Sequence, residues 1–152
     1  MEEFLDNIIN YLKTEFENDA EISETKKPQV LDAYKVGNTQ KATQPEVQVQ
    51  ILDTREQTNY TTLCGKRAIN IPLQITAYCG TKIKFGGIEK NVQRSSIKLA
   101  EKIVKYIDKL IYAEENYGIR YARHISSSPA LPMRDNGSMY MTAVRYDFIV
   151  QE

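Results

Sequence analysis

Two stretches of the chain carry apolar residues at the three- and four-residue spacing of a helix face. Residues 2–18 show this spacing with acidic residues near the start, which predicts an amphipathic helix. Residues 88–112 show it again and predict the longest helix. The other face of this second helix carries basic residues at steps of three and four: Lys90, Arg94, Lys98, Lys102, Lys105 and Lys109.

Five other stretches predict strands. Their expected ranges are 29–36, 47–52, 69–79, 119–125 and 140–150. Apolar and polar residues alternate most clearly over 69–79, and the last run alternates almost to the end of the sequence. Pro72 cannot donate a ladder hydrogen bond, so we expect its backbone to face an edge, a bulge or a strand start.

The order of elements is therefore helix, three strands, helix, two strands. Consecutive strands joined by turns favour an antiparallel or mixed sheet of about five strands, with both helices packed on one side. This is an α+β fold, and 152 residues suit one domain spanning 1–152. Gly86 and Gly87 favour a tight turn over a phosphate-binding loop, because neither phosphate-binding glycine motif is present.

Two connections are longer and more polar than ordinary turns. Residues 53–67 separate two expected strands, and residues 126–138 precede the last one with a proline-broken run. Loops of this kind are too polar to be buried in a core. We expect both to project from the domain, where a neighbouring protein could order them.

Composition removes several classes of function. Lys plus Arg and Asp plus Glu both number 20, so no overall field attracts nucleic acid or an anionic membrane. No apolar run approaches the roughly 20 residues of a membrane span, and the acidic amphipathic start does not resemble a signal peptide. We therefore expect no membrane partner and a cytosolic site of synthesis, with Cys64 and Cys79 as thiols.

Candidate catalytic groups are few. His124 is the single histidine and lies in an expected strand, which favours a surface position over a catalytic pair. Together with Cys64 and Cys79 it gives fewer soft ligands than a structural zinc site needs. The carboxylates of residues 15–24, and Glu114 with Glu115, lack apolar neighbours that would raise a pKa, so they are interpreted as solvated charge. We expect no enzyme activity, metal or cofactor.

The basic helix face has three interpretations. It could be an ordinary solvated face, or a nucleic-acid surface, although aromatic and base-reading residues are not interleaved with it. The third interpretation starts from the first 25 residues, where Lys13 is the only basic residue. Acidic and basic surfaces on one neutral domain could then meet head to tail between copies.

The succession of these segments resembles the tail terminator (tail completion, or minor capsid) proteins of long-tailed bacteriophages. The segments are the N-terminal helix, "EVQVQILDT", "RAINIPLQITAYCG", "NVQRSSIKLAEKIVKYIDKL" and "SSSPALPMRDNGSMYMTAVRYDFIV". The resemblance implies a structural protein that assembles as a ring of identical copies, typically a hexamer. The ring would cap the tail tube and meet the head completion protein, at the head-proximal end of the virion tail. DNA would pass through it without specific binding.

The resemblance also implies that the two polar connections contact the tube or neighbouring subunits. Arginine and tyrosine carry interface energy more often than other polar residues, which guides the choice of contact residues. The runner-up function is a small nucleic-acid-binding module that uses the basic face of helix 88–112. The expected interface residues are Arg55, Glu56, Tyr60, Arg67, Pro132, Arg134 and Asp135 from the loops, with Lys98 and Lys102 from the helix.

Overall fold

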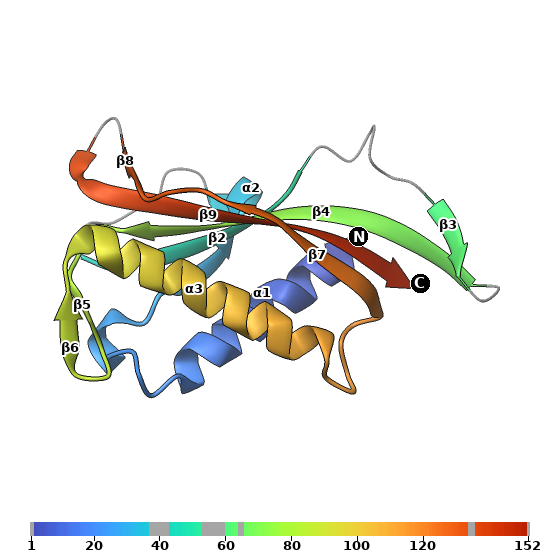
Figure 1. Cartoon of the computed structure of the whole chain (residues 1–152), viewed down its shortest axis with the longest axis horizontal. Helices are drawn as coiled ribbons and strands as arrows, with labels where there is room; N and C mark the ends of the chain where they lie inside the picture. The colour runs from blue at the N-terminus through green and yellow to red at the C-terminus, as the bar shows by residue number, and fades with distance from the viewer. Residues whose placement is uncertain (1, 37–42, 53–59, 64–65, 134–135, 152) are drawn as a thin grey trace.

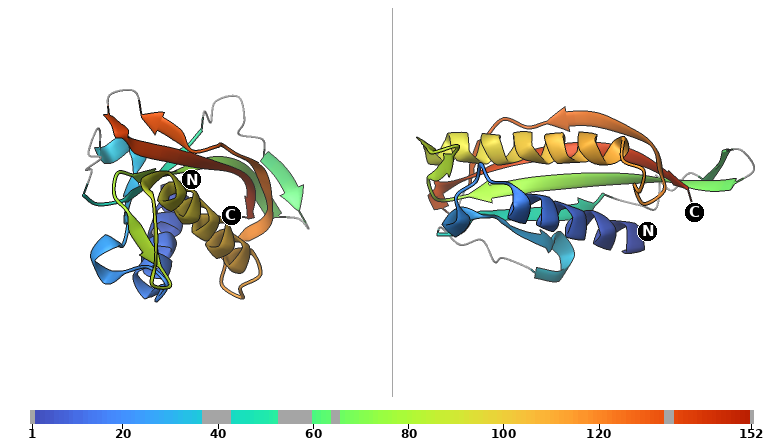
Figure 2. Two further views of the ribbon diagram at one scale, coloured as in Figure 1. Left: turned by 60° about the vertical axis from the view of Figure 1, so that its left-hand side comes forward. Right: turned by 90° about the horizontal axis from the view of Figure 1, so that it is seen from below.

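The computed structural model describes residues 2–36, 43–52, 60–63, 66–133 and 136–151. Helices α1 (Glu2–Asn18) and α3 (Val92–Ile111) lie together on one face of a mixed sheet (Figures 1 and 2). The expected α+β fold with two helices on one side is confirmed. The strands of the sheet are β1 (Gln29–Asp32), β2 (Glu46–Ile51), β3 (Tyr60–Leu63), β4 (Lys66–Cys79), β7 (Ile119–Ser127), β8 (Leu131–Met133) and β9 (Asn136–Gln151).

The sheet has the order β1-β2-β4-β9-β7, with β3 added beside β4 and β8 beside β9. Only the β1–β2 pair is parallel among the described strands. A separate hairpin of β5 (Ile83–Phe85) and β6 (Ile88–Lys90) precedes α3. Two short helices, η1 (Glu24–Lys26) and α2 (Ala33–Val36), complete the described elements.

The long last strand β9 lies between neighbours on both of its edges. It pairs with β4 from Tyr140 to Gln151 on one side, and with β7 and β8 on the other. The proline-broken run at 128–130 is the joint between β7 and β8, which follow each other along the same edge of β9. A strand of this length is stable because its backbone groups have partners on both sides.

The core lies between the sheet and the two helices. Alternate residues of β4 and β9 face the helices, as the alternation over 69–79 and 140–150 predicts. Phe4 of α1 meets Phe148 edge-on at 5.4 Å between ring centroids, and Phe16 meets Tyr106 of α3 at 5.0 Å. Each fully buried large apolar side chain contributes about 1.5–3 kcal/mol to stability, so this layer fixes the helices on the sheet.

Pro72 lies within β4, at the point where the pairing with β2 ends. Pairing between β2 and β4 ends at Ile51 and Leu73, and the next contact is Leu52 N–H donating to the carbonyl of Pro72 at 3.0 Å. The pyrrolidine nitrogen faces the same side as this carbonyl but has no hydrogen to return the bond to Leu52, so the pairing stops here. The expectation that Pro72 faces a local edge is confirmed.

The polar connections expected over 53–67 and 126–138 are shorter than expected, because strand residues of β3, β4, β7, β8 and β9 lie within them. Two expected element boundaries are also wrong. The strand expected over 29–36 ends at Asp32, because the Asp32 carboxylate accepts from Tyr34 N–H at 2.9 Å and starts the helical turn α2. The helix expected from residue 88 begins at Val92, because residues 88–90 pair with β5 and Asn91 caps the helix by accepting from Arg94 N–H at 2.8 Å.

Gly86 and Gly87 form the tight turn that the sequence favours. Both have positive φ, 61° and 80°, the combination required by a two-residue turn whose twist matches a hairpin. None of the described helices has the length and apolarity to cross a bilayer.

Candidate functional site

A cluster of charged and polar groups joins α3 to the segment after α1. Lys102 Nζ lies 3.0 Å from Asp19 Oδ2 and also contacts the carboxylate of Glu21. The Tyr106 hydroxyl, one turn further along α3, donates to Asp19 as well. Lys109 Nζ completes the series at 3.1 Å from Glu15 Oε1. Basic residues of α3 therefore face acidic residues of the same chain.

Backbone contacts hold this acidic segment in place. Lys27 Nζ donates to the carbonyls of Glu17 and Asp19 at 2.8 and 2.7 Å, at the C-terminal end of α1. Lysine at this position satisfies carbonyls that have no partner within the helix. Ile22 is buried and bridges to Phe85 of the β5–β6 hairpin. The segment is thus an anchored link between α1, α3 and the hairpin.

The cluster shifts the ionisation of its members. Burial alone would raise the pKa of Asp19, but hydrogen bonds from Tyr106 and Lys102 outweigh it and hold that pKa below its ordinary value. The hydrogen bond from Lys102 likewise lowers the pKa of Glu21. Burial would lower the pKa of Lys102, yet its two carboxylate partners raise it. Burial and the Asp19 carboxylate raise the pKa of Tyr106.

This arrangement corrects two sequence-based interpretations. The carboxylates of Glu15, Asp19 and Glu21 are not simply solvated, because each has a lysine partner on α3. Lys102 does not lie on a solvent-facing stripe, since it is buried with 7% exposure. Opposite charges of the two segments meet within the chain at these positions, and only part of the basic face stays open to other molecules.

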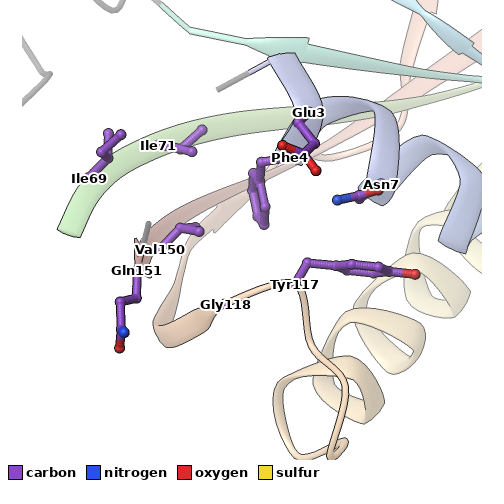
Figure 3. Close-up of a pocket in the computed structure, with 9 residues that line it drawn as sticks. All are labelled: Glu3, Phe4, Asn7, Ile69, Ile71, Tyr117, Gly118, Val150 and Gln151. Atoms are coloured by element: carbon purple, nitrogen blue, oxygen red, sulfur yellow. The ribbon is translucent and has the colours of Figure 1, made fainter. Parts of the chain in front are cut away.

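A hollow of about 420 Å³ lies at the opposite end of the helix layer from the hairpin (Figure 3). Four segments form it: the first turns of α1, the turn at 117–118, and the ends of β4 and β9. Its apolar part is buried and includes Phe4, which points between the strand ends and the turn in Figure 3. The residues that line the hollow are Glu3, Phe4, Asn7, Ile69, Ile71, Tyr117, Gly118, Val150 and Gln151.

The turn that borders the hollow has a constrained backbone. Tyr117 and Gly118 both have positive φ, 56° and 82°, and Ile119 N–H donates to the carbonyl of Asn116 at 3.1 Å. A Cβ at Gly118 would lie 2.7 Å from the carbonyl oxygen of Gln151, so only glycine fits. The conformation places Tyr117 at the border of the hollow, where β7 begins its pairing with β9.

Among the expected interface residues, Lys102 is buried. The other eight divide into three groups. Pro132 is exposed on β8 and Lys98 is half-buried on α3, 3.5 Å from Glu101. Tyr60 and Arg67 pair through their backbones within β3 and β4, with Thr62 opposite Arg67 and Tyr60 opposite Ile69. The remaining four lie outside the described residues: Arg55, Glu56, Arg134 and Asp135.

The two candidate reactive groups that the structure describes lie on different strands, His124 on β7 and Cys79 on β4. His124 is exposed on β7, with Nε2 at 2.8 Å from the Ser127 hydroxyl and its ring beside that of Tyr146. Cys79 is a buried free thiol, and burial raises its pKa, which disfavours the nucleophilic thiolate. Within the described ranges, no three His, Cys, Asp or Glu side chains form a group that could hold a metal ion.

No protein-family model matches the chain, and a search of curated proteins found no significant relative. Sequence reasoning missed the hollow, because its lining comes from four segments that are far apart in the chain. Gly118 gives a local signal in the sequence, as the residue that ends the second helical region. The ionic cluster has a clearer signal in the sequence. An acidic segment and a basic helix face in one small neutral domain are able to form ion pairs with each other.

Proposed function

We propose that this protein is a ring-forming structural subunit that caps a bacteriophage tail tube, ends tail elongation and presents the surface to which the head attaches. The proposal rests on the order and pattern of the segments, which resemble tail terminator proteins, and on one feature of the fold. That feature is the length of the sheet relative to the helices that cover it.

The strands β4 and β9 are much longer than the helix layer. β4 has 14 residues and spans about 46 Å at 3.3 Å per residue. α3 has 20 residues and spans about 30 Å at 1.5 Å per residue. The helices therefore leave part of the sheet uncovered, and the β3–β4 end extends beyond them (Figure 2). β3 pairs with β4 alone among the described strands.

An arm of this kind supports an assembly function. At its tip, Lys66 and Arg67 pair with β3 and have no partner in the described part of β9. A two-stranded ribbon of this kind is marginally stable in water unless another surface packs against it. In a ring, each copy supplies such a surface to the next, and a tail tube supplies one below. This arm consists of β3 and the start of β4, and it overlaps residues 53–67. The polarity of that connection is the reason we expect it to contact partners.

The nucleic-acid alternative draws less support from the same residues. Binding through α3 would require its lysines to neutralise phosphates. Lys102 and Lys109 already pair with carboxylates of the same chain, so fewer cations remain on that face.

Incubation with purified tail tubes tests the proposal directly. We expect the protein to bind one end of each tube, to stop addition of further tube protein and to be visible there by electron microscopy. An anisotropy titration with double-stranded oligonucleotides at two salt concentrations forms the second arm. Tubes that stay uncapped and keep growing, together with tight salt-dependent DNA binding, would favour the alternative.

A further inference from the structure

The β5–β6 hairpin displays an apolar side chain at one end of the molecule. Ile88 directly follows the Gly86-Gly87 turn and is 63% exposed, a large value for an isoleucine. The hairpin itself is anchored, because Gly86 N–H donates to the Glu21 carbonyl at 2.8 Å and Ile83 N–H donates to the Ser95 hydroxyl at 3.2 Å. The exposed Ile88 side chain is therefore carried by a hairpin that is hydrogen-bonded to the rest of the domain.

The surroundings of Ile88 are basic. Residues 82–101 contain five basic and two acidic residues. The basic side chains Lys84 and Arg94 are exposed, and Lys90 pairs across the hairpin with Ile83. Ile97, also at the surface with 36% exposure, lies between Arg94 and Lys98 on α3. This end of the molecule thus combines two exposed isoleucines with positive charge.

The hollow at the other end has the complementary character. Its floor is apolar, with Phe4, Ile69, Ile71 and Val150 all buried. The exposed Arg120 donates to the side chain of the lining residue Gln151 at 2.6 Å, but five exposed acidic residues outnumber it. They are Glu3 on the rim, Glu2 and Asp6 in the same turns of α1, and Glu114 and Glu115 just before the Tyr117 turn. None of these five carboxylates forms an ion pair with another described residue.

The two ends cannot meet within one chain. α3 runs from the hairpin to the turn beside the hollow, and its length of about 30 Å separates them. Figure 1 and the right-hand view of Figure 2 place the hairpin and the C-terminal end of β9 at opposite ends of the molecule. A contact between these surfaces must join two copies, and it is heterologous because different surfaces of each copy take part.

We propose that the β5–β6 hairpin of one copy inserts Ile88 into the hollow of the next copy, with lysine and arginine side chains facing the acidic rim. Burial of Ile88 supplies affinity, and the opposed charges align the copies and speed their encounter. The inference rests on the proposed ring and names the surfaces that join its subunits. A heterologous contact gives a closed ring if the rotation closes.

Sedimentation velocity over a range of protein concentrations tests the contact in solution. We expect salt-sensitive self-association of the wild type, and at least about tenfold weaker association for Ile88→Asp, since an ionised carboxylate cannot enter the apolar floor. The matched control is Ile125→Asp, which places the same change at a 41% exposed isoleucine on β7, away from both surfaces. It should associate like the wild type.

A mixing experiment separates this contact from a symmetric one. Ile88→Asp keeps an intact hollow, and Asn7→Trp fills the hollow but keeps an intact hairpin. Each variant alone should stay monomeric, while the mixture should give one-to-one dimers and nothing larger. If Asn7→Trp unfolds, Glu3→Lys replaces it, because Glu3 is exposed and its change alters only the rim charge.

Three results would overturn the contact: a wild type that stays monomeric at every concentration, an Ile88→Asp variant that assembles normally, or a mixture without dimers. None of these results decides the proposed function, because the tube-capping assay tests it independently. If the wild type and Ile88→Asp both cap tubes, the proposed ring function would be supported, and the hairpin would not be part of the interface between subunits.

Discussion

The ammonium of Lys102 lies among two carboxylates and near a tyrosine hydroxyl, with little access to water. A buried ion pair adds little net stability when both partners are present, but it becomes costly when one partner is removed. The cluster therefore fixes where the 19–22 segment lies against α3. The same rule makes Lys102 the residue of the basic face whose loss matters most for folding.

We expect Lys102→Met to lower the free energy of unfolding by about 2 kcal/mol, because Asp19 would keep a partly buried charge without its cation. Urea denaturation at neutral pH measures the change. Lys98→Met is the matched control on the same helix. Its ammonium is more exposed and faces Glu101 at 3.5 Å, so the loss should stay within about 0.5 kcal/mol. Equal losses in both variants would contradict the importance of the cluster.

The pH dependence of stability should report the same cluster. The pKa of Asp19 is lower in the folded chain than its unfolded value of about 3.9, so its contribution is present above that pH and is lost as pH falls through the folded pKa. We expect the stability difference between wild type and Asp19→Asn to be constant near neutrality and to vanish in strong acid. Thermal unfolding from pH 2 to pH 8 would show this, and a difference that persists at the acid end would contradict it.

Lys102 gives the alkaline counterpart. Its pKa is raised on folding, so its contribution is present below the unfolded value of about 10.4 and is lost as pH rises through the folded pKa. The stability of Lys102→Met should therefore depend less on pH above about 10 than that of the wild type. The comparison needs the same denaturant series carried to alkaline pH.

At the scale of elements, the joint between α3 and β7 depends on one glycine. Gly118 has a positive φ and lies close to the Gln151 carbonyl oxygen. The backbone N–H of Gln151 also donates to the Gly118 carbonyl at 2.8 Å. An added methyl group would push β7 away from the end of β9. The turn therefore sets the register in which β7 meets β9, from Ile119 opposite Val150.

Gly118→Ala should destabilise the fold by about 2–3 kcal/mol, the sum of the positive-φ cost and the backbone clash. Gly87→Ala measures the positive-φ cost alone, because the φ of Gly87 is 80° and no atom lies within 4 Å of the added Cβ. We expect that variant to lose only about 1 kcal/mol. Chemical denaturation of the two variants side by side measures the difference, and equal losses would rule out the clash.

The elements that could be predicted from the sequence are those whose apolar period matches their final burial. α1 was expected over 2–18 and occupies Glu2–Asn18, and β4 and β9 were found from strict alternation. Strands β3 and β8 were missed because they lie in stretches expected as polar connections. Two boundary errors come from local hydrogen bonds that override the period. Asp32 turns the end of β1 into α2, and the β5–β6 pairing takes the residues before Asn91 out of the helix.

At the scale of the whole molecule, basic and acidic residues gather at opposite ends of the helix layer, although the chain has 20 of each. Lys102 and Lys109 in the C-terminal half of α3 pair with carboxylates of the same chain, while the hairpin end stays basic and the first turns of α1 stay acidic. Both charged segments could be predicted from the sequence, but the ion pairs between them could not. Periodicity shows which face of a helix is polar, but not which element packs against that face. The hollow could not be predicted for the same reason.

The polar connections lead to a prediction for assembly. We expect Arg67→Glu or Arg134→Glu to leave the monomer folded while blocking ring formation or head-tail joining, because arginine at a contact is often a hot spot. Thermal unfolding checks the fold, and production of infectious particles checks the function. A variant that melts normally and still yields wild-type numbers of infectious particles would count against the role of that residue.

The central position of β9 also orders events during synthesis. β4 keeps one edge without a partner, and β7 has no strand to pair with, until residues 136–151 have emerged from the ribosome. A nascent chain stopped before that point displays a long apolar strand with free backbone groups, a form that readily adheres to other chains. Any shortened product lacking β9 should therefore accumulate as aggregates or be degraded.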